Sequence, residues 1–244
     1  MIKTLLAVIV ASWAFQSPVM ALETSERGLV VVLNMYTGEN NAIMNQWYKS
    51  ETSGALLAIA LGTHHAYAKT KLLYRDEAKL SGLVEGIREL NEDPNIKAID
   101  LIVYVHGRPD SLKLVYEGLG LLHPLTEWTP IQEITDRIKK IGSRKLRVVF
   151  SDACYSKSHN DKWLDAGFKV SSGSIAEDEN QSKDLVRFLA RWVKNQSFKI
   201  AIEDSNREMT YPVLDKIMRG FGYKANSRKE WLGDDSLTID SAIH

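Results

Sequence analysis

The sequence predicts a three-layer αβα sandwich around a mainly parallel β-sheet. Short apolar runs alternate with helix-like segments of about ten residues, which is the pattern of βαβ units. Several runs consist almost wholly of Val, Ile and Leu, as expected for strands that are covered on both faces. The chain has no internal repeat and no Gly/Ser-rich linker, so we expect one main domain.

The expected elements follow one another at regular intervals. The strands span residues 28–34, 69–74, 99–105, 146–150 and 168–171. Apolar residues at helical spacing predict helices at 80–90, 131–141 and 185–193, another helix beginning at Phe198, and a buried helix or strand at 53–62. Residues 211–244 are less periodic. We therefore expect one α/β domain over residues 22–210 and a C-terminal appendage, 211–244, packed on it.

The composition excludes several functional classes. Of the 244 residues, 44% are hydrophobic and 25% are charged, which excludes a disordered chain. Basic and acidic residues number 31 each, so no excess of positive charge favours nucleic acid as a partner. His64-His65 lacks a third metal ligand at a suitable spacing, and the single cysteine, Cys154, cannot form an intramolecular disulfide. We expect no metal and no cofactor.

Residues 1–21 have the layout of a cleavable secretory signal peptide. Lys3 precedes an apolar run that ends at Phe15. Pro18 then breaks the helix, and Ala21 stands at the expected cleavage position. The alternative is a membrane anchor, but the run is too short to span about 30 Å of hydrocarbon. We expect an exported protein, periplasmic or extracellular, with no membrane span after cleavage.

A histidine and the only cysteine lie just beyond two predicted strands. His106-Gly107 follows the strand at 99–105, and Ala153-Cys154 lies shortly after the strand at 146–150. Because ligands bind beyond the carboxyl ends of the strands in α/β sheets, we expect both side chains to face one crevice. The helix at 131–141 would return the chain between the two strands in parallel.

This pair has the chemistry of a nucleophilic thiol and its base. A free thiol has a pKa of about 8.5 and is mostly protonated at neutral pH, so a nearby imidazole must take its proton. Acyl transfer also needs donors for the oxyanion, and the N–H groups of Gly107 and Cys154 are suited to that role. The plain alternatives are a structural His106 and a buried, inert Cys154. His159, close to the cysteine in sequence, is an alternative base.

These residues resemble the motifs of the caspase–haemoglobinase fold. This cysteine peptidase group, clan CD, includes caspases, metacaspases, legumains, gingipains, clostripain and the CHAT peptidases. Its members place four apolar residues before His-Gly and a second apolar strand before Ala-Cys, with the histidine about 50 residues before the cysteine. Here the motifs read LIVYV-His106-Gly107 and LRVVFSD-Ala153-Cys154, and residues 163–174 resemble the segment that follows in CHAT-like members.

The resemblance covers about residues 28–206 and implies a caspase-like cysteine endopeptidase acting on a peptide or protein. It implies that Cys154 is the nucleophile and His106 the base. Gly107 and Cys154 would hold the oxyanion, and Asp152 and Ser172 would bind the substrate. The sequence indicates no oligomeric state.

Asp152 is the candidate for specificity. Residues i and i+2 of an extended chain point to the same side, so we expect Asp152 to lie beside Cys154 in the pocket. A carboxylate there would favour Arg or Lys before the scissile bond. Two alternatives stay open, because legumains carry an acidic residue here and read Asn, and because Asp152 could simply tie down a turn.

Other features leave a second function open. Many members of the group have Gly two residues after the cysteine, where this chain has Ser156. The alternative to a peptidase is an inactive binding or regulatory protein on the same scaffold, and a further one is another thiol-dependent hydrolase or acyltransferase. The acidic run at 177–179 either builds a pocket wall or is a solvated helix N-terminus, and we favour the second.

Overall fold

The computed structural model describes residues 21–35, 42–117, 126–178, 181–207 and 211–243. Residues 1–20, which make up nearly all of the predicted signal peptide, lie outside this part of the chain. Among the helices that are described, none has both the length and the apolar character needed to cross a membrane. Cleavage at Ala21 therefore stays a prediction.

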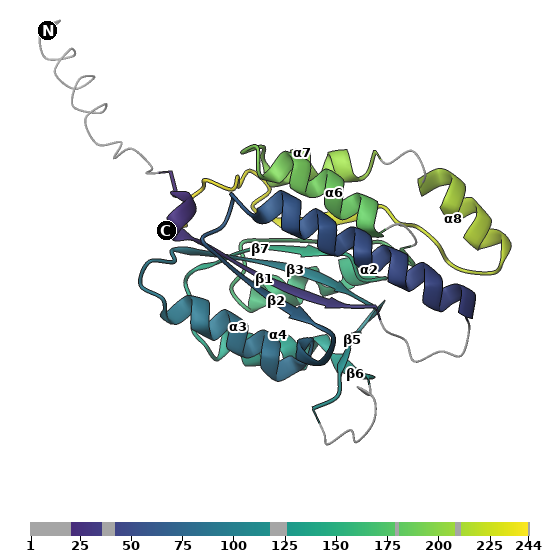
Figure 1. Ribbon diagram of the computed structural model, residues 1–244, viewed down its shortest axis with the longest axis horizontal. Helices are drawn as coiled ribbons and strands as arrows, with labels where there is room; N and C mark the ends of the chain where they lie inside the picture. Colours follow the sequence, from purple (N-terminus) through teal and green to yellow (C-terminus); the bar gives the residue numbers. More distant parts are fainter. Residues whose placement is uncertain (1–20, 36–41, 118–125, 179–180, 208–210, 244) are drawn as a thin grey trace, which may run out of the picture.

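A six-stranded sheet forms the centre of the molecule, in the order β2-β1-β3-β7-β8-β9 (Figure 1). Its strands are β1 (Arg27–Asn34), β2 (Lys69–Tyr74), β3 (Ala98–Val105), β7 (Leu146–Ser151), β8 (Val170–Ser174) and β9 (Lys229–Gly233). The first five strands in the sheet order run parallel, and β9 is antiparallel to β8. The predicted α/β class with a mainly parallel sheet is confirmed.

Helices cover both faces of this sheet. They are α2 (Ala42–Thr63), α3 (Leu80–Glu92), α4 (Ile131–Lys139), α5 (Asn160–Asp165), α6 (Gln181–Trp192), α7 (Phe198–Ser205) and α8 (Tyr211–Gly220). One face packs against α3, α4 and α5, and the other packs against α2, α6 and α7 (Figure 1). The stretch at 53–62 proves to be the second half of α2.

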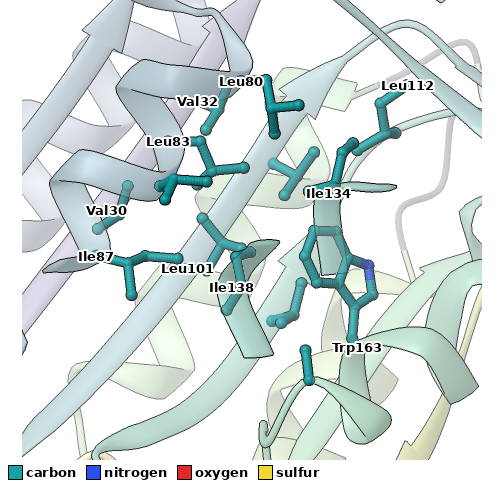
Figure 2. Close-up of a cluster of buried hydrophobic side chains, with 14 of the residues drawn as sticks. Val30, Val32, Leu80, Leu83, Ile87, Leu101, Leu112, Ile134, Ile138 and Trp163 are labelled. Atoms are coloured by element: carbon teal, nitrogen blue, oxygen red, sulfur yellow. The ribbon is translucent and has the colours of Figure 1, made fainter. Parts of the chain in front are cut away.

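The core beneath α3 fixes the strand that leads to the candidate base. Val30 of β1 and Leu101 of β3 pack in one cluster with Leu83 and Ile87 of α3, and each of these side chains is at most 1% exposed (Figure 2). The helix residues recur at the spacing of one helical face, which is why the sequence pattern predicts this helix. Truncating such a side chain to Ala typically costs about 2–5 kcal/mol.

Residues 211–244, expected as an appendage, supply the sixth strand of the sheet. The buried guanidinium of Arg147 in β7 donates to Asp100 of β3 at 2.9 and 2.7 Å. It also donates to the carbonyl oxygen of Ile239 at 2.6 Å. This network therefore ties the C-terminal segment to the two central strands. β9 reads KEWLG, with few apolar residues, so its pattern does not predict a strand.

A small second sheet begins at the candidate site. It consists of β4 (Gly107–Arg108), β5 (Ser111–Val115) and β6 (Thr126–Pro130), paired antiparallel in that order. The sequence pattern does not predict these short strands. Their consequence for the site is that the backbone after His106 turns into β4 and is held by a hydrogen bond from the N–H of Lys113 to the His106 carbonyl at 2.8 Å.

Candidate active site

Neighbouring strands carry the two predicted motifs to one edge of the sheet. β3 and β7 pair in parallel, with Val103 opposite Ser151. The N–H of Asp152 then donates to the Val103 carbonyl at 2.8 Å, which extends the pairing by one residue. His106 follows the last residue of β3, and Cys154 lies three residues after the end of β7. The structure therefore brings both residues to the same carboxyl edge, as the sequence predicts.

The backbones of the two motifs touch at Gly107. A Cβ atom on Gly107 would lie 2.2 Å from the carbonyl oxygen of Cys154 and 3.0 Å from its nitrogen. It would also lie 2.8 Å from the Cβ of Ala153. Real Cβ atoms essentially never approach other atoms this closely, so glycine at 107 is what allows the contact. The N–H groups of Gly107 and Cys154, the predicted oxyanion donors, belong to these two touching segments.

His106 is held in a largely buried setting. Its Nε2 lies 3.4 Å from the carbonyl oxygen of Met35, just beyond β1. The ring of Tyr48 in α2 meets the imidazole edge-on, with 4.9 Å between the ring centroids. Burial, and next the positive charge of Lys113, lower the pKa of His106 to about 4. The imidazole is therefore neutral at neutral pH, which is the state that accepts a proton from a thiol.

Cys154 stands on a tight turn after β7 and is partly exposed. Its sulfur accepts a hydrogen bond from the N–H of Asp178 at 3.4 Å. The next residue, Tyr155, has a φ of 57°, in the left-handed region that non-glycine residues rarely adopt. The hydroxyl of Tyr155 donates to Glu177 at 3.2 Å. The segment at 177–178 therefore holds both the nucleophile candidate and the turn that presents it.

Ser156, which stands where many caspase-like peptidases have Gly, stabilises the turn that carries Cys154. Its buried hydroxyl donates to the Ala153 carbonyl at 2.6 Å and accepts from the N–H of Ser174 in β8 at 3.0 Å. Gly173 complements it, because a Cβ there would lie 2.2 Å from the carbonyl carbon of Ser156. The serine therefore ties the nucleophile turn to the sheet.

His159, the alternative base, contacts the other motif instead. Its ring is buried, and its Nε2 lies 2.8 Å from the carbonyl oxygen of Arg108, two residues after His106. Beside it, Ser158 donates to the Pro109 carbonyl at 2.6 Å. Both side chains therefore link the segment after the cysteine to the segment after the histidine, which is a positioning role.

The two predicted substrate-binding residues are fully buried. The Asp152 carboxylate lies 2.6 Å from the ammonium of Lys229 in β9. Burial raises the pKa of Asp152 to about 8, against the opposing effect of Lys229. The hydroxyl of Ser172 in β8 has no hydrogen-bond partner among the described residues. Substrate binding by Asp152 and Ser172 stays a prediction, and for Asp152 the structure supplies an internal partner that the sequence does not predict.

The acidic run at 177–179 is not simply solvated. Asp178 is buried, and its carboxylate accepts from Ser174 at 2.5 Å and from Lys229 at 2.9 Å. Asp184 of α6 completes the group, with its carboxylate 2.5 Å from the same ammonium. The expectation of a solvated helix N-terminus is therefore wrong for Asp178, while residue 179 lies outside the described residues.

Sequence reasoning missed several residues around the site. Lys229 is distant in sequence from both motifs and belongs to no recognisable pattern, and the acidic run at 177–179 gave no sign that Asp178 pairs with it. Met35 and Tyr48, which contact His106, were missed for the same reason. A strand-end position could have drawn attention to Met35, because it lies just beyond β1 at the same sheet edge.

Comparison with solved structures supports this fold. The chain is similar to a secreted C11 cysteine protease from Bacteroides thetaiotaomicron in complex with an irreversible peptide inhibitor, with a TM-score of 0.50 and 9% identity over 78% of this chain and 59% of that one. A second structure of a secreted C11 cysteine protease from the same organism, "iotapain", gives a TM-score of 0.50 and 10% identity, covering 77% and 63% of the two chains.

These similarities show the fold alone, and they confirm the predicted caspase–haemoglobinase architecture. The chain spans about three fifths of the length of the C11 chains that it matches. No family model matches the sequence, and no curated protein sequence matches it.

Proposed function

We propose that the protein is an exported cysteine endopeptidase that uses a His106–Cys154 dyad. The observation that carries the proposal is the contact between the His106-Gly107 and Ala153-Cys154 segments at the carboxyl edge of β3 and β7. The solved structures with this fold are described as cysteine proteases, one of them with a peptide inhibitor, which supports a peptide or protein substrate.

The chemistry of the proposal uses four groups of the chain. The neutral imidazole of His106 takes the thiol proton, and the Cys154 thiolate attacks the carbonyl carbon of the scissile bond. The N–H groups of Gly107 and Cys154 stabilise the negative charge on the carbonyl oxygen. His106 then gives its proton to the leaving amine, and water hydrolyses the thioester to free the enzyme.

Two details of the site favour activity over a purely binding role. The first is that Cys154 is partly exposed rather than buried in the core. Ser156, the departure that favoured an inactive relative, is used in hydrogen bonds within the turn.

Export is part of the proposal and rests on the sequence of residues 1–21. The mature chain would begin near Leu22, and periplasmic or extracellular material would lack the leader. Intact-mass measurement of the protein from its native compartment tests this, because retention of Met1 would contradict cleavage.

The finer expectation, a preference for Arg or Lys before the scissile bond, depends on an available Asp152 carboxylate. Because Lys229 already pairs with this carboxylate, we do not extend the proposal to basic residues.

Hydrolysis of a mixed fluorogenic peptide pool tests the proposed activity. We expect turnover by the wild type, its complete loss in Cys154→Ala, and a loss of about 100-fold or more in His106→Ala. Selective alkylation of Cys154 should slow in His106→Ala as well. No turnover of any peptide, together with an unreactive Cys154, would favour the binding or regulatory protein instead.

A further inference from the structure

One lysine and three aspartates form a closed group behind the nucleophile turn. The ammonium of Lys229 lies 2.6 Å from Asp152, 2.9 Å from Asp178 and 2.5 Å from Asp184, and all four side chains are 0% exposed. The ammonium donates hydrogen bonds to Asp178 and Asp184, and it contacts Asp152 as an ion pair. Among the described residues, these three aspartates also form a set close enough to bind one cation, and Lys229 supplies that cation.

This group adjoins the proposed nucleophile through two of its members. Asp152 lies two residues before Cys154, and the N–H of Asp178 donates to the Cys154 sulfur. The ammonium is therefore linked to the thiol in two ways, through the short chain segment between Asp152 and Cys154 and through the hydrogen bond from the Asp178 N–H.

The chain holds Lys229 in this position firmly. The lysine begins β9 and lies opposite Ser174 in the antiparallel pairing with β8. Asn206 binds the lysine backbone on both sides, since its Oδ1 accepts the Lys229 N–H at 2.7 Å and its Nδ2 donates to the Lys229 carbonyl at 2.8 Å. These two hydrogen bonds and the strand pairing fix the backbone from which the lysine side chain reaches the three aspartates.

We propose that Lys229 is a specificity-determining residue, which occupies the acidic group beside Cys154 and excludes Arg and Lys from the position before the scissile bond. A second cation in this closed volume would meet a like charge at short range, with its carboxylate partners already engaged. The inference rests on the proposed peptidase function and names its substrate class, peptides with an uncharged residue before the scissile bond.

A pair of charge-balanced variants tests the inference. In Lys229→Ala with Asp184→Asn, the lysine chain is absent and one acidic group is removed with it, so that a basic substrate side chain can take its place. In Lys229→Met with Asp184→Asn, the charges are the same but an unbranched side chain keeps the space filled. Rates are measured on peptides that differ only in Arg or Ala before the scissile bond.

We expect the wild type to hydrolyse the Arg peptide no faster than about three times the Ala peptide. The double variant Lys229→Ala with Asp184→Asn should raise the ratio of the two rates, Arg peptide over Ala peptide, by about tenfold or more, as expected for one charge-assisted pairing. The double variant Lys229→Met with Asp184→Asn should leave this ratio at the wild-type value. A wild-type ratio above about ten would overturn the inference, even if the variants fail to fold. An unchanged ratio in the folded Lys229→Ala pair would also overturn it.

Binding measurements separate this inference from the proposed activity. The same two variant pairs are made with Cys154→Ala, and their affinities for the uncleaved Arg and Ala peptides are compared by calorimetry. The inference is supported if the Arg peptide binds more tightly than the Ala peptide only in the variant that carries Lys229→Ala. It is contradicted if the preference for the Arg peptide is the same in the Lys229→Ala and Lys229→Met variants. Absence of hydrolysis in the wild type would refute the peptidase proposal while this comparison still decides the role of Lys229.

Discussion

Replacing Gly107 by Ala should separate the two halves of the candidate site. The new Cβ would lie 2.2 Å from the Cys154 carbonyl oxygen, whereas ordinary contact begins at 3.4 Å. The His106-Gly107 segment must therefore move by about 1 Å, because the opposing atoms belong to backbone and cannot rotate away. A displacement of about 1 Å can reduce the rate about 100-fold, and overpacking at a rigid contact costs about 1–3 kcal/mol of stability.

The assays for Gly107→Ala are alkylation kinetics and urea unfolding. We expect the rate of Cys154 alkylation and the rate of peptide hydrolysis to fall together, while the free energy of unfolding falls within the stated range. Gly220→Ala is the matched control, since a Cβ there meets nothing within 4 Å and the residue ends a helix. Wild-type alkylation and hydrolysis in Gly107→Ala would refute the contact on which the proposed function rests.

Three further predictions concern single side chains, two at the site and one in the core. The fold lowers the pKa of His106 from 6.5 to about 4, so the unfolded chain binds this proton more readily than the folded protein does. The free energy of unfolding should therefore fall by about 3 kcal/mol as the pH decreases from 6.5 to 4. Urea midpoints across this range measure the loss, and His106→Asn should show a shallower decline. Ser156→Ala removes the hydroxyl that bridges Ala153 and Ser174, and we expect a loss of about 1–3 kcal/mol with hydrolysis still detectable; an undiminished unfolding midpoint would contradict this. Arg147→Met leaves the buried Asp100 without its bidentate partner and should cost about 3–5 kcal/mol by chemical denaturation.

The parallel strands and the covering helices are predictable because their signals are local. β3 and β7 read as continuous apolar runs, and α3 and α4 repeat their apolar residues every three or four positions. The strand ends then place His106 and Cys154 at one edge, because adjacent parallel strands share their carboxyl ends. The sequence alone therefore predicts that these two residues lie at the same edge of the sheet.

The remaining features depend on contacts between distant segments. β9 is a short edge strand with charged residues, so no periodicity indicates it. Its first residue, Lys229, pairs with carboxylates from three other segments of the chain. The expectation that Asp152 lies in the pocket beside Cys154 rests on its position two residues before the cysteine. It could not include the lysine, because an ion pair across 77 positions leaves no pattern in the sequence.

Covalent trapping of Cys154 tests the central claim most directly. The native protein is incubated with a peptide that carries an uncharged residue before an electrophilic ketone, and the product is analysed by intact mass and peptide mapping. The account predicts one equivalent of label on Cys154, formed much more slowly in His106→Ala and competed by excess substrate peptide. Labelling that occurs only after denaturation, or at the same rate without His106, would contradict a His106–Cys154 dyad.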